Sequence, residues 1–172
     1  MKLSYIYEVF LLALLVLLQT LLLNRIHLFG VATPILYIYF LLKLPIGRNP
    51  FYVIISGFMM GLLIDIFLNT PGMNAAATTI VAAFRKPVIN LIFGREDYEQ
   101  YVPGIHSSTG PFVRFTILMV VFHQTLLFFI ESFTFFNITH TLLLIISSSL
   151  ITCILIFALD SLTHNSNPRE QS

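Results

Sequence analysis

The sequence predicts an all-α integral membrane protein with six transmembrane helices. Of its 172 residues, 57% are hydrophobic and only 10% are charged, whereas soluble domains average about 25% charged residues. Apolar runs of about 20 residues, the length that crosses a bilayer core of about 30 Å, follow one another with short polar connections. We therefore expect one transmembrane domain over residues 1–163 and a disordered polar tail over 164–172.

The first two predicted spans are residues 5–23 and 28–44. The first follows Lys2 and resembles the core of a signal peptide. It is too long for such a core, and no cleavage site with small residues follows Leu23, so we expect an uncleaved helix. The second span begins at a turn over Gly30 to Pro34 and is short, so whether it crosses the membrane fully stays open.

The third and fourth spans, residues 50–68 and 74–93, predict a tight helical hairpin. Gly57 and Gly61 are four residues apart and leave a stripe without side chains, which allows close approach of a second helix in a membrane. Pro71 and Gly72 mark the chain reversal. Small residues with the same spacing continue after the turn: Ala75, Thr79 and Ala83.

One carboxylate, Asp65, precedes the reversal by about one helical turn. An acid at the centre of a transmembrane helix costs about 2.5 to 3.5 kcal/mol to insert, so it is a functional candidate by default. Its carboxylate could accept hydrogen bonds from the first amides of the fourth span, where Asn74 is the expected N-cap. Alternatively, it could contact a partner or a ligand. We weigh these interpretations equally, and they are compatible.

Two adjacent cations, Arg85 and Lys86, precede Pro87 in the fourth span. The simpler expectation is that both side chains reach the membrane surface along a kinked helix. The alternative is that the pair binds a lipid phosphate.

The fifth and sixth spans are predicted at residues 112–130 and 139–160. Gln124 and Glu131 are seven residues apart and so share a helix face, and we group them with Asp65 and Asn74 as candidate partner-binding residues. Ser149, Thr152, Ile156 and Asp160 form a stripe that predicts hydrogen bonds between helices. The acidic segment 94–111 before the fifth span is either a docking site or a solvated loop.

The distribution of cations predicts the orientation. Six spans place both termini on one side, and eight of the nine Lys and Arg residues fall on that side, which the positive-inside rule assigns to the cytoplasm. Asp65, the Pro71 turn and Glu131 then lie near the outer face. The eight cations are Lys2, Lys43, Arg48, Arg85, Lys86, Arg95, Arg114 and Arg169.

Several classes of function are disfavoured. A net charge of +1 and the lack of a basic stripe argue against a nucleic-acid partner. The single cysteine, Cys153, excludes an intrachain disulfide and a cysteine metal cluster. No zinc-protease, nucleophile-elbow or P-loop motif is present. We expect no catalytic residues, no metal site and no cofactor, and therefore no enzyme.

The third and fourth spans resemble the rod shape-determining protein MreD family of bacteria. The similarity rests on Gly57, Gly61 and Asp65 leading into residues 71–76, PGMNAA, and extends to residues 23–40 and 122–133. The family pattern of Gly-x-x-x-Asp, a Pro/Gly turn and small residues matches Gly61, Asp65, Gly72 and Ala75. The polar segment 94–111 departs from the family pattern, which leaves its role open.

The resemblance implies a scaffold in the bacterial inner membrane. Such a protein works with MreC, the MreB cytoskeleton, RodA and a class B penicillin-binding protein to direct lateral peptidoglycan synthesis and maintain rod shape. It also implies a fold similar to the six-helix substrate-binding components of energy-coupling vitamin transporters, although fold does not fix function. The alternative is a small-molecule-binding component of a transporter. Membrane lipids are expected contacts in either case.

Overall fold

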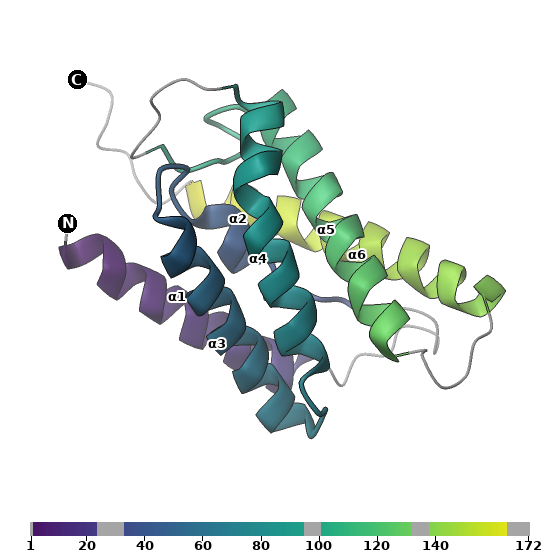
Figure 1. Ribbon diagram of the computed structural model, residues 1–172. Coiled ribbons are helices and arrows are strands. Elements are labelled where there is room, and N and C mark those ends of the chain that lie inside the picture. Colours follow the sequence, from purple (N-terminus) through teal and green to yellow (C-terminus); the bar gives the residue numbers. More distant parts are fainter. Residues whose placement is uncertain (1, 24–32, 95–100, 132–137, 165–172) are drawn as a thin grey trace, which may run out of the picture.

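The computed structural model describes residues 2–23, 33–94, 101–131 and 138–164, and within these ranges all regular secondary structure is helical, with no strand (Figure 1). Four helices, α3 to α6, are long and apolar enough to cross a membrane, and the apolar part of α1, Tyr5–Leu21, is shorter. The all-helical class is confirmed. The elements are α1 (Lys2–Leu21), α2 (Tyr39–Lys43), α3 (Pro50–Leu68), α4 (Met73–Ile92), α5 (Thr109–Glu131) and α6 (Ile138–His164).

The region expected as the second span is not a continuous helix. Residues 28–32 lie outside the described part, residues 33–38 are non-helical, and only Tyr39–Lys43 form a helix, α2. Pro34 has no amide hydrogen and disfavours a helical conformation at the residue before it. The expectation of a helix over 28–44 is therefore wrong for the described residues 33–38.

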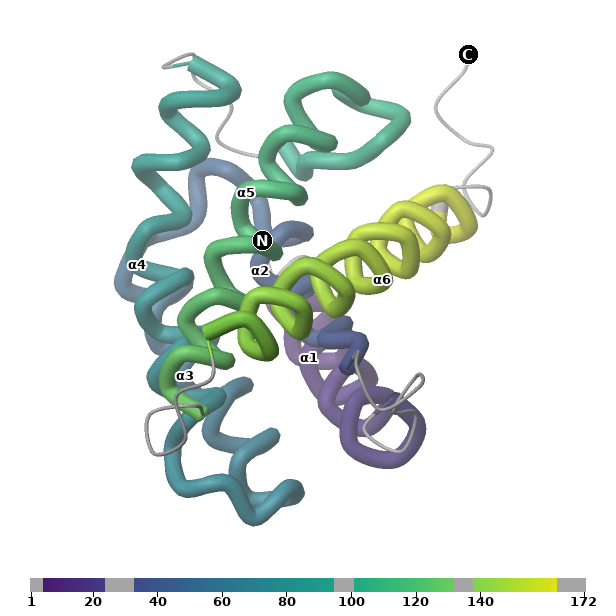
Figure 2. The backbone as a smooth tube through the Cα atoms, turned by 90° about the vertical axis from the view of Figure 1, so that its right-hand side faces the viewer, coloured from purple at the N-terminus to yellow at the C-terminus, as the bar shows by residue number. Residues whose placement is uncertain are grey.

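This interrupted segment lies inside the bundle. Residues 35–42 are all buried, together with Leu44, and α2 lies near the centre in both views of the backbone (Figures 1 and 2). Non-helical backbone at membrane depth is tolerated only where protein or a polar cavity surrounds it. The long helices supply that surrounding, so residues 33–44 form the core of the domain rather than a lipid-facing span.

The hairpin of α3 and α4 is confirmed, and glycine is required at its contact. A Cβ atom on Gly61 would lie 2.6 Å from the Ala75 Cα, and one on Gly57 would lie 3.0 Å from the Ala82 Cβ. Asn49 caps α3 at its start by accepting a hydrogen bond from the Phe51 amide at 2.9 Å. The two helices lie side by side along their length (Figure 1).

The face that α4 presents to α3 differs from the expected one. Ala75 is buried, but Thr79 is only partly buried and Ala83 is exposed. Each step of four residues rotates the position by about 40° around an α-helix, so a strict four-residue spacing leaves the contact face. The residues of α4 that are buried near the glycine stripe are Ala75, Thr78 and Ala82.

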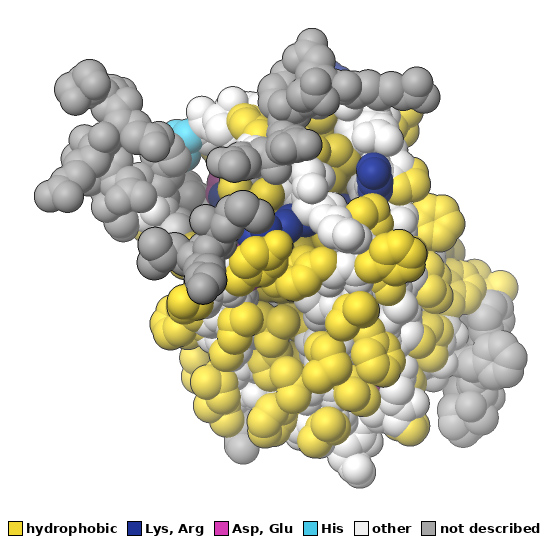
Figure 3. Space-filling view, turned by 60° about the vertical axis from the view of Figure 1, so that its left-hand side comes forward, with side chains coloured by type: hydrophobic (Ala, Val, Ile, Leu, Met, Phe, Trp, Pro, Cys, Tyr) yellow, Lys and Arg dark blue, Asp and Glu magenta, His cyan; other side chains and the backbone are white. Residues whose placement is uncertain are grey.

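The outer surface suits a hydrocarbon environment. Large apolar side chains are exposed on α1, α3 and α6, among them Phe10, Phe51 and Ile154. Figure 3 shows hydrophobic side chains covering the lower part of one face, with Lys and Arg atoms only above them. This distribution suits a chain with four helices that could cross a membrane.

Candidate functional site

Asp65 lies at the interface between the two helices of the hairpin and is 4% exposed. Its Oδ1 accepts hydrogen bonds from the Asn74 amide at 3.0 Å, the Asn74 Nδ2 at 2.9 Å and the Thr70 hydroxyl at 2.6 Å. Its Oδ2 accepts from the Ala75 amide at 2.8 Å. Asp65 of α3 thus caps the start of α4, as the structural interpretation predicts.

The turn explains why the cap comes from another helix. Asn69 ends α3 in the left-handed conformation, and Gly72 occupies the N-cap position of α4 with a φ of 78°. Gly72 has no side chain to accept a hydrogen bond, so the second and third amides of α4 bond to Asp65 instead. The expectation that Asn74 is the N-cap is wrong, because Asn74 is the second residue of the helix.

A chain of polar contacts continues from Asp65 across the bundle. The Tyr37 hydroxyl donates to Asn74 Oδ1 at 2.7 Å and lies 3.2 Å from His123 Nε2 on α5. Since the Tyr37 hydrogen is used by Asn74, His123 donates from Nε2, and its Nδ1 has no partner among the described residues. The network joins α3, α4, the interrupted segment and α5. Neither a role for Tyr37 nor its contact with His123 was predicted from the sequence.

Side chains of the surrounding helices satisfy the backbone of the interrupted segment. Gln19 of α1 donates to the Pro34 carbonyl at 3.0 Å and accepts from the Leu36 amide at 2.8 Å. On α6, Ser148 accepts from the Thr33 amide and Thr152 from the Ile35 amide, at 3.0 and 3.1 Å. Of the predicted polar stripe on α6, Thr152 thus bonds to backbone and also to Gln124 of α5, whereas buried Ser149 has no hydrogen-bond partner among the described residues.

Arg85 satisfies backbone carbonyls at the other end of this segment. Its Nε donates to the Leu41 carbonyl at 2.6 Å, its Nη2 bonds to the Leu44 carbonyl, and the side chain is 2% exposed. These are the unpaired carbonyls at the end of α2, where the helix dipole also favours a cation. The expectation that Arg85 reaches the surface, or binds a lipid phosphate there, is wrong. Lys86 is exposed, and for it a lipid contact stays a prediction.

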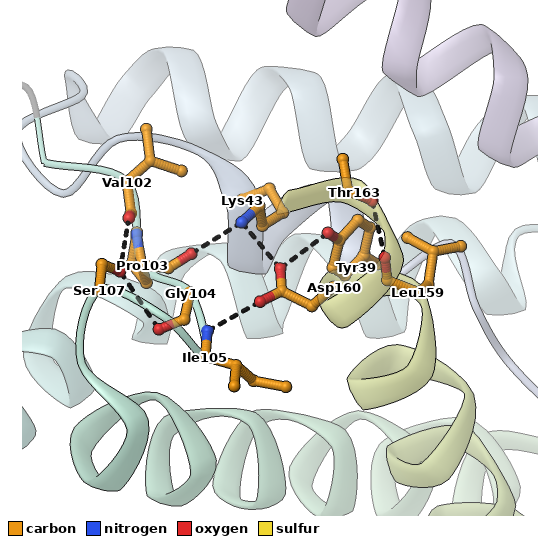
Figure 4. Close-up of polar contacts among 10 residues, drawn as sticks. All are labelled: Tyr39, Lys43, Val102, Pro103, Gly104, Ile105, Ser107, Leu159, Asp160 and Thr163. Atoms are coloured by element: carbon orange, nitrogen blue, oxygen red, sulfur yellow. Dashed lines mark hydrogen bonds and ion pairs between the residues drawn. The ribbon is translucent and has the colours of Figure 1, made fainter. Parts of the chain in front are cut away.

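Two ionic clusters hold the end of the bundle opposite the α3–α4 turn. The Asp160 carboxylate accepts from Lys43 at 2.8 Å, the Tyr39 hydroxyl at 2.9 Å and the Ile105 amide at 2.8 Å (Figure 4). Buried Glu8 of α1 pairs with Arg48, which precedes α3. The predicted interhelical role of Asp160 is confirmed, whereas Glu8 was not identified from the sequence.

A cavity of about 300 Å³ opens beside the α3–α4 turn. Helix ends surround it, because α1, α3 and α5 end there and α4 and α6 begin there. Its described lining residues are Gln19, Thr33, Ile35, Tyr37, Leu68, Thr70, Met73, Asn74, Leu127, Phe128, Glu131, His140 and Leu144.

The four candidate partner-binding residues have different environments. Asp65 and Asn74 are bonded to each other, and Gln124 is fully buried with its Nε2 3.2 Å from the Thr152 hydroxyl. Only Glu131, at the end of α5, is exposed and lines the cavity. Of the four, Glu131 alone is therefore directly accessible to a partner.

Other sequence-based candidates lie outside the described residues, including Arg95, the acidic part of the loop at 96–99 and the tail at 165–172. Within the described ranges, no group of three or more His, Cys, Asp or Glu side chains could hold a metal ion. Comparisons of the chain with protein-family models, with curated proteins and with solved structures found no match.

Proposed function

We propose that this chain is a non-enzymatic membrane scaffold of the MreD type, which binds MreC in the bacterial cell-elongation complex and helps direct lateral peptidoglycan synthesis. One observation supports a scaffold most directly. The polar side chains at membrane depth bond mainly to backbone and to one another, as Asp65, Arg85 and Gln19 do. These groups hold a rigid frame and leave few reactive atoms accessible for chemistry.

The proposed orientation follows from the cations. Lys43, Arg48 and Arg85 lie at the end of the bundle away from the α3–α4 turn, since Arg48 precedes α3 and Arg85 bonds to the end of α2. The positive-inside rule assigns this end to the cytoplasm. In this proposal the chain is a multi-pass protein of the inner membrane with both termini cytoplasmic, and Glu131 faces outward.

The proposed contact with MreC centres on Glu131. It is the accessible member of the candidate set, and exposed apolar residues such as Phe129 and Leu142 lie near it in sequence on α5 and α6. A transmembrane helix of MreC could pack on the apolar surface while a polar group at its outer end bonds to Glu131. RodA, the class B penicillin-binding protein and MreB would join through the same complex.

Quantitative co-purification of MreC tests this contact. Glu131→Ala is expected to reduce the amount of MreC recovered per tagged chain, because it removes the exposed carboxylate without touching the helix contacts. Lys86→Ala is the matched control, since it removes an exposed charge in the part of α4 that lies far from Glu131. Unchanged MreC recovery and unchanged cell shape with Glu131→Ala, at equal protein levels, would refute the assignment.

The second candidate function is a small-molecule-binding component of a transporter, with a fold similar to those of vitamin transporters. The cavity of about 300 Å³ favours it, because this volume lies at the lower end of the range for small-molecule sites. Purification with a stoichiometric metabolite and an ATPase module, without MreC, would support this function over the scaffold.

A further inference from the structure

The cavity beside the α3–α4 turn has an acidic lining. Glu131 is its one carboxylate, and no Lys or Arg occurs among the described lining residues. A second carboxylate, Asp65, lies directly behind the wall, because Thr70 and Asn74 both line the cavity and both donate to it. Glu131 and Asp65 are thus the described charges at this site, and each favours a cation nearby.

The side-chain hydrogen-bond donors in the part of the wall around Asn74 are already used. The Tyr37 hydroxyl hydrogen goes to Asn74, and the Thr70 hydroxyl hydrogen goes to Asp65. The two hydrogens of the Asn74 amide go to Asp65 and Thr70. These three side chains can offer a ligand lone pairs but no further hydrogens, so this part of the wall suits a donor-rich group better than an anion.

The surrounding helix ends act in the same direction. Helices α1, α3 and α5 end at the cavity with their partially negative carbonyl ends, and their residues Gln19, Leu68 and Phe128 line it. Helices α4 and α6 begin there; Asp65 already offsets the positive start of α4, so three negative ends stand against the positive start of α6. The rings of Tyr37 and Phe128 are also present, and aromatic faces attract cations.

We propose that this cavity binds an ammonium group, carried either by a small soluble amine or by a lipid headgroup, with Glu131 as its counter-ion. The acidic lining and the aromatic rings select for a cation, and the lone pairs around Asn74 can accept from an ammonium group. This site would exist whether the chain acts as a scaffold or as a transporter component, so its test is separate from recovery of MreC.

The experiment uses the full-length chain in phosphatidylglycerol nanodiscs, whose lipid has no ammonium group, with choline as the probe in isothermal titration calorimetry. The neutral control ligand is 3,3-dimethyl-1-butanol, which has the shape of choline without its charge. We expect choline to bind at least about tenfold more tightly than the neutral ligand. Glu131→Gln should weaken choline binding about tenfold or more, because a charge-assisted contact of that strength is lost.

Two further variants separate the cavity from general effects of charge. Leu144→Phe adds volume at the lining without changing charge and should also weaken choline binding. Lys86→Gln lies about 18 Å along α4 from Asn74 and should leave the affinity unchanged. All variants are compared only after their melting curves match that of the unaltered chain.

A lipid arm identifies the source of the ammonium group. If a headgroup is the natural ligand, exchanging phosphatidylglycerol for phosphatidylethanolamine should reduce choline binding by competition and raise the melting temperature of the unaltered chain more than that of Glu131→Gln. If a soluble amine is the ligand, the exchange should leave choline binding unchanged. The proposal is overturned if the neutral ligand binds as tightly as choline, if Glu131→Gln has no effect, if inorganic phosphate binds instead, or if neither choline nor phosphatidylethanolamine is bound.

Discussion

Replacing Asp65 with Asn tests whether this buried carboxylate stabilises the hairpin. The substitution keeps the size and one carbonyl oxygen, which can still accept from Asn74. The new side-chain NH₂ group, however, faces the Ala75 backbone amide, which in the unaltered chain donates a hydrogen bond to Asp65 Oδ2 at 2.8 Å. A buried donor left without a partner costs about 1 to 3 kcal/mol. The lost attraction between the charge and the start of α4 adds about 0.3 to 1 kcal/mol.

The expected loss in the free energy of unfolding for Asp65→Asn is therefore about 1 to 4 kcal/mol. For a chain of this length, that loss lowers the melting temperature by about 3 to 16 °C. Melting is followed by circular dichroism in mild detergent. Amide hydrogen exchange provides a local readout, and the amides of residues 73–76 should exchange faster while those in the middle of α5 keep their rate.

Glu131→Gln is the matched control for this experiment, because it also neutralises one carboxylate but at an exposed position. It should change the free energy of unfolding by less than about 0.5 kcal/mol. The reasoning is refuted if Asp65→Asn melts with the unaltered chain and the Ala75 amide keeps its exchange rate. Equal destabilisation by both substitutions would also contradict a specific capping role.

Three further substitutions test other contacts. Gly61→Ala should lower the free energy of unfolding by about 1 to 3 kcal/mol, because the added methyl group forces α3 and α4 apart. The control Gly110→Ala should melt like the unaltered chain, because a Cβ atom there meets nothing within 4 Å. Equal melting temperatures of the two variants would contradict the close contact. Arg85→Met should cost about 2 to 5 kcal/mol because the carbonyls at the end of α2, including that of Leu41, lose their donors; an unchanged melting temperature would contradict this capping. Asp160→Asn should accelerate limited proteolysis within residues 101–108 while helix content is kept, and an unchanged cleavage rate would show that the loop is held in another way.

The hairpin could be predicted from the sequence because its determinants are local. Gly57, Gly61 and Asp65 lie on one helix and precede the turn directly, so their spacing specifies both the close approach and the cap. The face of α4 was assigned less well, because the choice between Thr78 and Thr79 depends on how far the helix has rotated at the contact.

The interrupted segment could not be predicted, because its stabilising partners are distant in sequence. Apolar residues favour a helix over 28–44, but Gln19, Ser148 and Thr152 supply the bonds that allow residues 33–38 to stay non-helical. The role of Arg85 could not be predicted for the same reason, because its acceptor, the Leu41 carbonyl, is 44 residues away. When such acceptors are not known, a cation in an apolar run of sequence is expected to lie at the membrane surface.

Glu131 is the one candidate partner-binding residue that the structure leaves exposed, and its contact with MreC is a proposal. Its place at the end of α5 follows from helix length alone, whereas the cavity beside it requires five helix ends to meet. Such a cavity has no signal in a single sequence, because its lining residues are spread from Gln19 to Leu144 and each is ordinary in its own helix.

Purification of the tagged, unaltered chain in mild detergent, with bound proteins and small molecules identified together by mass spectrometry, tests the scaffold proposal most directly. The scaffold proposal predicts that MreC is recovered in stoichiometric amount with other cell-wall synthesis proteins, whether or not an amine or a lipid is also bound. Recovery of an ATPase module with a stoichiometric metabolite, and no MreC, would contradict it.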